Sequence, residues 1–314
     1  MNLDKASLVT LGITCHNAID TIARALRSAI QQDWPQLEIL IVDDCSTDGS
    51  TDLISSIINS EPRARLIRHT ENVGVASARN TILREAHGEF VAYFDDDDVS
   101  AADRIKAQVH RLCAYEQQSG GTLCFCYCHR DVVPIGYARA THQADSIGST
   151  PPEPHGPMVA DYLLGLNVSS SFAWGNSGAG TLLARREAFL ACGGFDPTFR
   201  RCAEWDLAIR AAYLGAHFIS VDRALVTVYQ TMSSDKTHEI ALEYTLMLRR
   251  KHQAYLKNKR MITLSRLRAY STYFTEKGSP LTGYALRFLA VAIQPRSVAL
   301  RVARRLGLHR GDHE

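Results

Sequence analysis

The sequence lacks any apolar run long enough to cross a bilayer. A spanning helix needs about 20 mostly apolar residues, whereas the longest candidate, residues 281–293, is shorter and contains Arg287. The first residues include an early acid and no long apolar core, so we expect no signal peptide. The eight cysteines do not have the spacing of a small disulfide-bonded domain. We therefore expect a cytosolic protein with reduced thiols.

Two common phosphate-binding loops are also missing. A dinucleotide-binding turn needs G-x-G-x-x-G after the first strand, and a P-loop needs G-x-x-x-x-G-K-[ST]. The first predicted strand, residues 8–14, runs instead into Cys15, His16 and Asn17. A nucleotide, if one is bound, must be held through its base, its ribose and a metal ion on its phosphates.

Acidic residues are scarce in one part of the chain. Residues 1–248 hold 20 Lys and Arg against 30 Asp and Glu, a net charge of −10, but residues 249–310 hold 15 against one, a net charge of +14. This asymmetry indicates an acidic body and a basic tail with a polyanionic partner, although we expect no nucleic acid. Helices that combine apolar stripes with arginines can lie on anionic membranes. The alternative is a helical bundle with its charges in solvent.

Strand and helix patterns alternate through the first 130 residues. Apolar strand patterns occupy 8–14, 37–42, 64–69, 90–94 and 123–128, and helix patterns occupy 20–32, 50–59, 76–87 and 102–118. Repeated units of this kind predict an α/β fold with a mainly parallel sheet and helices on both faces.

The regular alternation ends after residue 130. The proline-rich stretch 131–157 is expected to form a long loop. Beyond it, the patterns predict strands at 181–184 and 224–229 and helices at 185–191 and 204–214. From residue 237 only helices are expected, at 237–258, 262–276, 281–293 and 296–306.

Four consecutive aspartates, Asp95 to Asp98, follow the strand pattern at 90–94 directly. Adjacent carboxylates repel one another, and no neighbouring residue in the sequence is a cation. Mg²⁺ and Mn²⁺ take oxygen ligands and often bridge carboxylates to phosphate. Because ligands of open α/β sheets bind at the carboxyl ends of strands, the run predicts a divalent-metal site. The alternative is a solvated acidic turn.

A second acidic pair, Asp43 and Asp44, ends the strand pattern at 37–42. Carboxylates accept hydrogen bonds from N–H and O–H donors, which suits recognition of a base or a ribose. The alternative role is to cap the next helix. Ser46 or Asp48 is enough for capping, which leaves the pair unexplained.

Together these motifs resemble the family 2 glycosyltransferases, which have the GT-A fold. The matching segments are GITCHN (12–17), VDDCSTD (42–48), NVG with ARN (72–74 and 78–80), FDDDD (94–98), GGFD (193–196) and EWDL (204–207). They follow the family's order over about residues 7–235. The resemblance implies a Rossmann-like GT-A catalytic domain over 1–235, with a nucleotide-sugar half (1–130) and an acceptor half (131–235). A basic helical extension would occupy 236–314.

The resemblance also implies an activity. It is the inverting transfer of a sugar from a UDP- or dTDP-sugar to a glycan or lipid-linked glycan, with Mn²⁺ or Mg²⁺, in cell-surface polysaccharide biosynthesis. Such acceptors suggest peripheral contact with the inner face of the plasma membrane, through residues 281–310. Two alternatives stay open. A sugar nucleotidyltransferase should carry a basic, glycine-rich loop, which residues 16–22 lack. An inactive glycan-binding relative would have no reason to keep a catalytic carboxylate.

Carried over by position, the resemblance assigns the candidate site. Nucleotide binding falls to Thr14, His16, Asn17, Asp44, Gly74, Arg79 and Asp96, and metal binding to Asp95 and Asp97. Glu204 stands where the family has its catalytic base, usually an aspartate. Asp206 is the rival, but a helix turns it about 200° away from Glu204. The acceptor or donor-sugar side would comprise Trp174, Asn176, Trp205, Asp206 and Lys236.

Four cysteines complete the expectations. Cys45 stands where the family usually has a glycine in its nucleoside motif, and a residue with a Cβ argues against a left-handed backbone at that position. Cys124, Cys126 and Cys128 alternate along a predicted strand and therefore face one side of it. We predict that these three are buried core residues, because metal sites usually draw cysteines from C-x-x-C turns.

Overall fold

The computed structural model describes residues 7–121, 123–166, 175, 177–231 and 237–293. The chain divides into two compact units, one of residues 1–157 and 172–232, the other of residues 158–171 and 233–314. Residues 158–171 thus group with the C-terminal helices, which the sequence pattern did not indicate. The expected functional domains, 1–235 and 236–314, stay a prediction.

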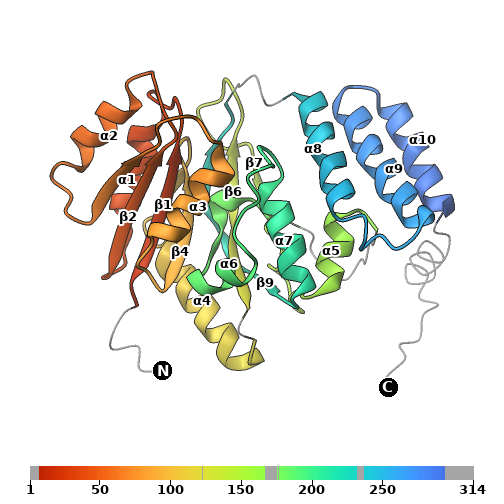
Figure 1. Cartoon of the computed structure of the whole chain (residues 1–314), viewed down its shortest axis with the longest axis horizontal. Helices are drawn as coiled ribbons and strands as arrows, with labels where there is room; N and C mark the ends of the chain where they lie inside the picture. The colour runs from red at the N-terminus through yellow and green to blue at the C-terminus, as the bar shows by residue number, and fades with distance from the viewer. Residues whose placement is uncertain (1–6, 122, 167–174, 176, 232–236, 294–314) are drawn as a thin grey trace. The chain divides into compact units, whose positions relative to one another are not determined.

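The first unit is built on one nine-stranded mixed sheet (Figure 1). Its strand order is β3-β2-β1-β4-β8-β6-β9-β5, and β7 pairs with β6. The strands are β1 (Val9–Cys15), β2 (Leu37–Asp43), β3 (Ala64–Arg68), β4 (Phe90–Asp95), β5 (Val99–Ser100), β6 (Cys124–Val133), β7 (His142–Ala144), β8 (Leu183–Arg185) and β9 (His217–Tyr229). The first four strands of this order are parallel, as are β6 and β9, while β8 runs antiparallel to both β4 and β6.

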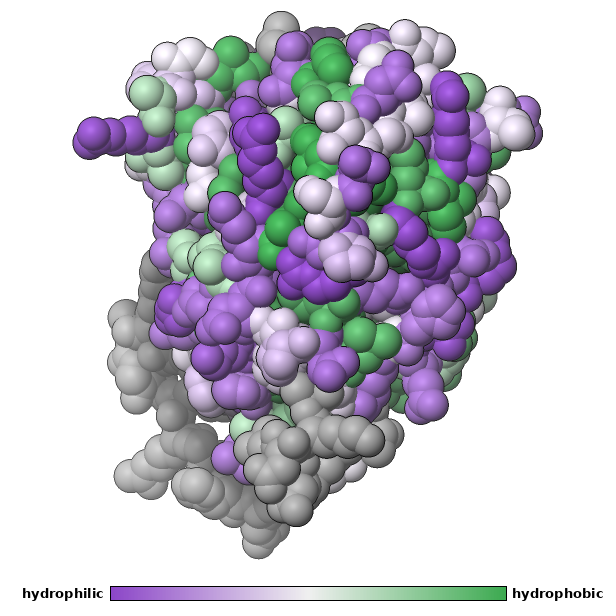
Figure 2. Space-filling model, turned by 90° about the vertical axis from the view of Figure 1, so that its left-hand side faces the viewer, coloured by the Kyte–Doolittle hydropathy of each residue, from purple (hydrophilic) through white to green (hydrophobic). Residues whose placement is uncertain are grey.

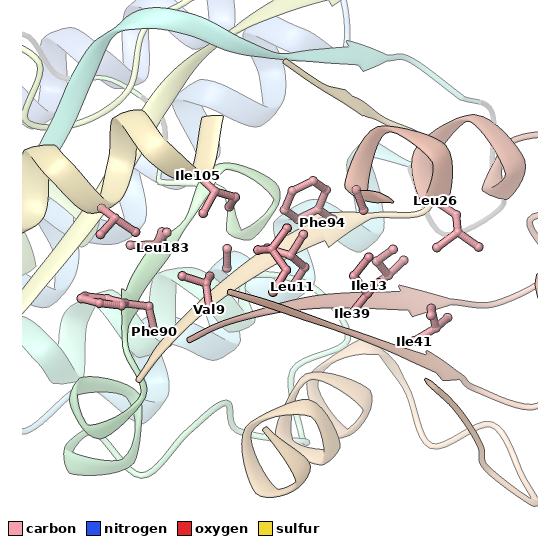
Figure 3. Close-up of a cluster of buried hydrophobic side chains, with 14 of the residues drawn as sticks. Val9, Leu11, Ile13, Leu26, Ile39, Ile41, Phe90, Phe94, Ile105 and Leu183 are labelled. Carbon is pink, nitrogen blue, oxygen red and sulfur yellow. The ribbon is translucent and has the colours of Figure 1, made fainter. Parts of the chain in front are cut away.

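One face of the sheet carries a large apolar cluster (Figure 3). Alternate residues of β1, namely Val9, Leu11 and Ile13, point to this face, as period-two alternation requires. Three helices supply the opposing side chains: α1 (Ile22–Ile30), α2 (Ser50–Ile58) and α4 (Arg104–Ser119). Burial of these apolar surfaces, at roughly 25 cal/mol per Å², is the main stabilising term of the unit.

Helix α3 (Val75–Glu85) packs against β1 and β2. Gly12 allows this close packing, because a Cβ there would lie 2.5 Å from Cγ2 of Ile82. An aromatic cluster is centred on Tyr93, whose ring makes edge contacts with Phe189 and Phe195 at 5.5 and 5.3 Å. The remaining helices of this unit are η1 (Ala179–Thr181), α6 (Arg186–Ala191) and α7 (Ala203–Tyr213).

The α/β fold with a mixed sheet and long parallel pairings confirms the expected fold class. The prediction of a long loop at 131–157 is partly wrong. Strand β6 continues to Val133, β7 follows, and α5 begins at Pro157. β9 begins at His217 instead of residue 224 because it pairs with β6 from Cys124 onward. The apolar pattern of these segments is interrupted, so their full strand lengths were not predicted. Pairing with neighbouring strands stabilises them.

The second unit is helical in its described part. Its helices are α5 (Pro157–Leu163), α8 (His238–Lys251), α9 (Lys259–Glu276) and α10 (Pro280–Ile293). Thr237 and Asn258 cap α8 and α9 by accepting backbone N–H bonds at 3.3 and 3.0 Å. The sequence prediction of one helix over 237–258 is too long, since α8 ends at Lys251. The predicted helix at 296–306 lies outside the described residues.

Within the described ranges, no helix is long and apolar enough to cross a membrane. Figure 2 shows the side of the molecule that carries α2 in Figure 1. Hydrophilic side chains cover most of this side, with smaller apolar areas between them. This mixture of polar and apolar surface is ordinary for a water-exposed face.

Candidate active site

The carboxyl ends of β1, β2 and β4 lie side by side. β1 is the central strand of the three, and Thr14 pairs with Val42 on one side and Asp95 on the other. Cys15 pairs with Asp43 one residue further along. The parallel register therefore brings three segments that are far apart in the sequence to one edge of the sheet, where open α/β sheets bind ligands.

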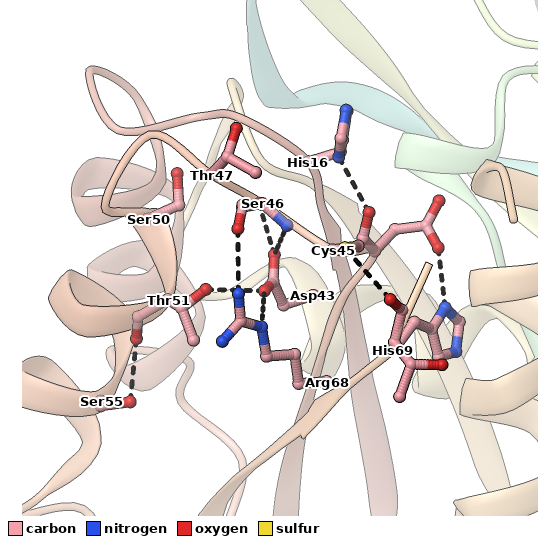
Figure 4. A network of polar contacts seen from close by, with 12 residues as sticks. His16, Asp43, Cys45, Ser46, Thr47, Ser50, Thr51, Ser55, Arg68 and His69 are labelled. Carbon is pink, nitrogen blue, oxygen red and sulfur yellow. Dashed lines mark hydrogen bonds and ion pairs between the residues drawn. The ribbon is translucent and has the colours of Figure 1, made fainter. Parts of the chain in front are cut away.

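Asp43 is fully buried and holds the loop that follows β2 (Figure 4). Its Oδ1 accepts from the Ser46 amide at 3.2 Å and from the Ser46 hydroxyl, and its Oδ2 accepts from the Thr51 hydroxyl at 2.7 Å. Arg68 lies 3.5 Å from the same Oδ2. With both oxygens engaged by the protein, Asp43 shapes the loop.

The backbone at Cys45 is left-handed, with φ at +64°. The expectation that a cysteine at this position would avoid a left-handed backbone is therefore wrong. The turn brings the Ser46 amide back to Asp43, and the Cys45 thiol donates to the carbonyl of Thr70 at 3.5 Å. Local hydrogen bonds therefore impose a conformation that a residue with a Cβ adopts at some cost. Figure 4 shows this network between the β2 end and the neighbouring segments.

Asp44 is buried and organises a second loop. Its Oδ1 accepts from the His69 ring at 2.7 Å and the Val73 amide at 3.1 Å, and its Oδ2 accepts from the Gly74 amide at 2.7 Å. Gly74, with φ at +91°, is the residue before α3. Because a carboxylate has about four lone-pair sites, Oδ2 retains capacity for one further donor.

His16, Asn17 and Thr14 lie at the end of β1. The His16 ring donates from Nδ1 to the Asp44 carbonyl at 2.9 Å, since a carbonyl only accepts. Its backbone amide donates to Asp96 Oδ2 at 3.2 Å. Asn17 has a left-handed φ of +51° and accepts from the Thr47 amide at 2.9 Å, while Thr14 is buried. The first two motifs are thus joined by hydrogen bonds.

The four aspartates make different contacts. Asp95 is 35% exposed and lies 3.3 Å from the Arg79 guanidinium. Asp97 accepts from the Thr231 hydroxyl at 3.1 Å, and its carbonyl accepts from Arg24 at 2.6 Å. Asp98 is buried and accepts from the Tyr229 amide at 3.2 Å.

Repulsion and burial change the acidity of two of these carboxyls. Burial, followed by the charges of Asp97 and Asp95, raises the pKa of Asp96 to about 7, against a bond from the His16 amide that lowers it. Burial and the charges of Asp95 and Asp97 raise the pKa of Asp98 to about 8. Residues 95–98, which we call the acidic loop, thus carry more negative charge than their surroundings neutralise.

Arg79 joins the acidic loop to the candidate base. Its guanidinium lies 3.3 Å from Asp95 Oδ1 through one nitrogen and 3.8 Å from Glu204 Oε2 through another. It also stacks over Phe195, 5.4 Å from the ring centre. The Arg79 side chain is 9% exposed and Glu204 is 28% exposed, so the glutamate remains within reach of solvent or a ligand.

Asp206 has a different environment from Glu204. It is fully buried and accepts from Arg210 at 2.8 Å, and Arg210 in turn donates to the carbonyls of Cys192 and Gly194. Trp205 is half-buried between these two acids in the first turn of α7. Asp206 therefore stabilises the loop before α7, and Glu204 is the more accessible carboxylate.

Several predicted residues cannot be placed or lie away from the site. Trp174, Asn176 and Lys236 lie outside the described residues. Cys124, Cys126 and Cys128 are buried, with exposed fractions of 1%, 0% and 0%, which confirms the core prediction.

Three supporting residues were missed from the sequence. Gly180 leaves room for Asp95, because a Cβ there would lie 2.3 Å from its Oδ2. Arg104 is fully buried below the acidic loop and donates to the Tyr93 carbonyl at 3.0 Å. Asn80 pairs with the backbone of Phe195. Of these three residues, only Asn80 belongs to a motif that the sequence analysis identified, the ARN motif at 78–80.

The donor set suits a divalent cation that completes its coordination with a ligand. Across the described ranges, no group of three or more His, Cys, Asp or Glu side chains is arranged to hold a metal by itself. Asp95 and Asp97 are partly exposed, however, and belong to a loop with excess negative charge. Mg²⁺ and Mn²⁺ sites that use one or two carboxylates take their other oxygens from phosphate and water.

The fold is shared with solved glycosyltransferase structures. S. aureus TarS 1-349 aligns with a TM-score of 0.59 at 17% identity, covering 93% of this chain and 83% of that chain. The mannosyltransferase PcManGT from Pyrobaculum calidifontis, in complex with GDP-Man and Mn²⁺, aligns with a TM-score of 0.57 at 21% identity, covering 98% and 82%. At these identities the likeness establishes the fold, which is of the expected GT-A type.

Sequence comparison finds one matching family model and several relatives, each over part of the chain. Residues 10–132 match the family model Glycosyl transferase family 2. The succinoglycan biosynthesis protein ExoO of Rhizobium meliloti is 38% identical over 112 residues, which are 36% of this chain and 32% of that protein. The Escherichia coli glucosyltransferase WfaP is 38% identical over 103 residues, 33% of this chain and 40% of that protein.

Residues 10–132 are therefore similar to the family 2 glycosyltransferases, as the motifs indicated. The chain spans less than half of the length of these two relatives.

Proposed function

We propose that the chain is an inverting, divalent-metal-dependent glycosyltransferase. It would move a sugar from a UDP- or dTDP-sugar to a glycan or lipid-linked glycan during cell-surface polysaccharide biosynthesis. WfaP is named as a transferase from UDP-Glc to a diphosphoundecaprenol-linked sugar, and ExoO as a polysaccharide biosynthesis protein. These names support the donor and acceptor classes.

The Asp95–Arg79–Glu204 chain of ion pairs carries the proposal. It brings a candidate metal ligand and a candidate base to two nitrogens of one guanidinium, although they are far apart in the sequence. A donor diphosphate held near Asp95 would leave its sugar near Glu204. The arrangement suits direct displacement at the anomeric carbon.

The chemistry needs one proton acceptor. Glu204 would accept the proton of the acceptor hydroxyl while the hydroxyl oxygen forms the new bond to the anomeric carbon. The bond from that carbon to the diphosphate oxygen breaks, and the nucleoside diphosphate leaves. Because attack and departure occur on opposite faces, one displacement inverts the anomeric configuration.

Asp95 and Asp97 would hold the cation, either Mn²⁺ or Mg²⁺. A bound divalent cation offsets negative charge on the diphosphate leaving group. The PcManGT structure contains Mn²⁺, which supports a metal in this fold. Asp44 and the His16–Asn17 turn would bind the nucleoside, with the spare lone pair of Asp44 facing a base N–H donor, and Asp96 would lie near the ribose.

The family match and the solved glycosyltransferases favour glycosyl transfer over nucleotidyl transfer. The accessible Glu204 favours an active enzyme over an inactive glycan-binding relative, which would have no use for a base beside the metal ligands. A lipid-linked acceptor would place the protein at the inner face of the plasma membrane, in peripheral contact through residues 281–310.

Donor hydrolysis with a panel of UDP-, dTDP- and GDP-sugars tests the proposal. We expect the wild type to hydrolyse a UDP- or dTDP-sugar slowly when Mn²⁺ is present. Glu204→Gln should lower turnover at least ~100-fold, the range of a lost general base, with little change in donor affinity. Absence of hydrolysis with every donor would contradict the proposal.

Asp206→Asn is the matched control. It should lower the unfolding temperature, because Arg210 loses its buried carboxylate, and it should affect turnover less than Glu204→Gln does. If Asp206→Asn gives the larger loss of turnover in folded protein, the base assignment is wrong.

A further inference from the structure

Helix α10 carries large apolar side chains that water reaches. Leu281 is 84% exposed, Tyr284 59%, Phe288 72% and Leu289 52%. We call these four residues the α10 strip. Single exposed apolar residues are normal in soluble proteins, but four on one short helix form a patch that points to a binding surface.

The strip lies on one side of the helix. Each helical residue advances by about 100°, so Leu281, Tyr284 and Phe288 fall within a sector of about 60°. Leu289 extends the sector on its other side. Gly283 and Ala290, the buried residues of α10, lie about 180° to 200° from Leu281. The strip therefore faces away from the side that packs against the bundle.

Packing against α9 fixes this rotation of α10. A Cβ on Gly283 would lie 2.2 Å from Oγ1 of Thr275, so only glycine allows the two helices to approach this closely. The Ser271 hydroxyl donates to the Gly283 carbonyl at 2.8 Å. Since both contacts hold the same side of α10, exposure of the strip is a consequence of the bundle's own packing.

The helices of the unit that carries the strip are basic in sequence. Residues 237–293 contain ten Lys and Arg against three Glu, a net charge of +7. Arg287 lies within α10, and Arg260 donates to the carbonyl of Ile293 at its end, at 2.7 Å. An apolar helix face with basic flanks is complementary to an anionic lipid surface, where each Lys or Arg near the headgroups contributes about 1 kcal/mol.

We propose that the α10 strip docks on an anionic lipid surface. The four apolar side chains enter the boundary between headgroups and acyl chains, and the basic residues around them contact lipid phosphates. Lipid binding would bring the protein to a lipid-linked acceptor. This purpose rests on the proposed function. Lipid binding is measurable without a sugar donor, so either proposal can fail alone.

A second copy of the chain is the competing occupant. Two such units would bring a net charge of +7 against +7, which opposes self-association at low salt. The same charge attracts anionic lipid. Charge complementarity therefore favours the lipid surface.

Co-sedimentation of the full chain with vesicles tests the proposal. We expect binding to vesicles of phosphatidylglycerol and phosphatidylcholine in equal parts, and little binding to pure phosphatidylcholine. Salt should release part of the protein, because attraction between exposed charges is screened over about 10 Å at 0.1 M. The double variant Leu281→Ser with Phe288→Ser should weaken binding at least ~10-fold, since apolar burial contributes to interfacial affinity.

Leu214 and Tyr137 supply a matched control, because they are 56% and 64% exposed and belong to the first unit. The double variant Leu214→Ser with Tyr137→Ser should bind vesicles like the wild type. Circular dichroism should give both double variants the wild-type helix content, and Tyr284→Ser provides a second strip variant if the first is unfolded.

Three outcomes would overturn the proposal. Wild type that does not sediment with anionic vesicles has no lipid-binding surface. Folded strip variants that bind as tightly as the wild type would assign binding to charge alone. A dimer in solution that the strip variants abolish, without any vesicle binding, would make a second copy the occupant.

Discussion

The carboxylates of the acidic loop differ in what surrounds each of them. Asp95 faces Arg79, and Asp97 accepts from Thr231. Burial and the neighbouring charges raise the pKa of Asp96 to about 7 and that of Asp98 to about 8. A proton on either carboxyl near neutral pH relieves repulsion that a divalent cation would otherwise offset.

These raised pKa values predict how stability depends on pH. In the unfolded chain both carboxyls have pKa values near 4. Between about pH 4 and pH 8 the folded state therefore retains protons that the unfolded state has released, and the free energy of unfolding falls as pH rises. We expect the unfolding temperature without divalent cations to fall from about pH 5 to about pH 8, measured by differential scanning fluorimetry.

Asp98→Asn isolates this effect, because the amide stays neutral at every pH. The variant should lose part of the decline that the wild type shows. Adding Mn²⁺ should stabilise the wild type more at the higher pH, where the loop is more fully ionised. Equal pH dependence of the two proteins would refute the assignment to Asp98.

At the residue scale, the sequence predicted which side chains gather but not what each one does. Asp43 and Asp44 are adjacent and chemically identical, and both were candidates for nucleoside contact. The fold turns Asp43 into the loop after β2 and directs Asp44 to the loop before α3. These two roles depend on side-chain direction and backbone conformation, which the periodicity of the sequence does not reveal. The left-handed backbone at Cys45 could not be predicted for the same reason.

At the scale of elements, α3 links the acidic loop to the segment before α7. Arg79 on this helix contacts Asp95 and Glu204, and the next residue, Asn80, pairs twice with the backbone of Phe195. The Asn80 side chain donates to the Phe195 carbonyl at 2.7 Å and accepts from its amide at 2.8 Å. One turn of helix therefore positions both the ion-pair chain and its support.

Asn80→Ala should destabilise the first unit. It leaves a backbone amide and a carbonyl without their partners, at a cost of about 1–3 kcal/mol in the free energy of unfolding. Urea denaturation followed by fluorescence measures this. Asn59→Ala, at an exposed position after α2, is the matched control and should stay within about 0.5 kcal/mol.

The same substitution should also reduce turnover, because α3 carries Arg79. A variant with wild-type stability and turnover would contradict the positioning role of the Asn80 pair.

The predictability of the elements follows from how they are stabilised. β1, β2 and β4 are buried strands with clear apolar runs, and their predicted ranges lie close to the observed ones. β3 is only partly buried, but its predicted range also lies close to the observed one. β7 has three residues of largely exposed pattern, and its formation depends on pairing with β6. Short elements of this kind have no periodicity of their own to be recognised.

At the scale of the whole molecule, the basic part of the chain begins at residue 249, within the second compact unit. The described helices that follow β9 belong to a separate compact unit rich in lysine and arginine. The sequence did not predict that residues 158–171 join this unit. Such a grouping arises from contacts between segments far apart in the chain, which local patterns do not encode.

The central claim is that the carboxyl edge of the sheet binds a nucleoside diphosphate together with a divalent cation. Calorimetric titration of UDP, with and without Mn²⁺, tests it most directly. We predict that Mn²⁺ increases UDP affinity in the wild type and in the control Asp33→Ala, whose side chain is 67% exposed. Asp97→Ala should fold and lose the Mn²⁺ dependence. Equal UDP affinity with and without Mn²⁺ in the wild type would contradict the account.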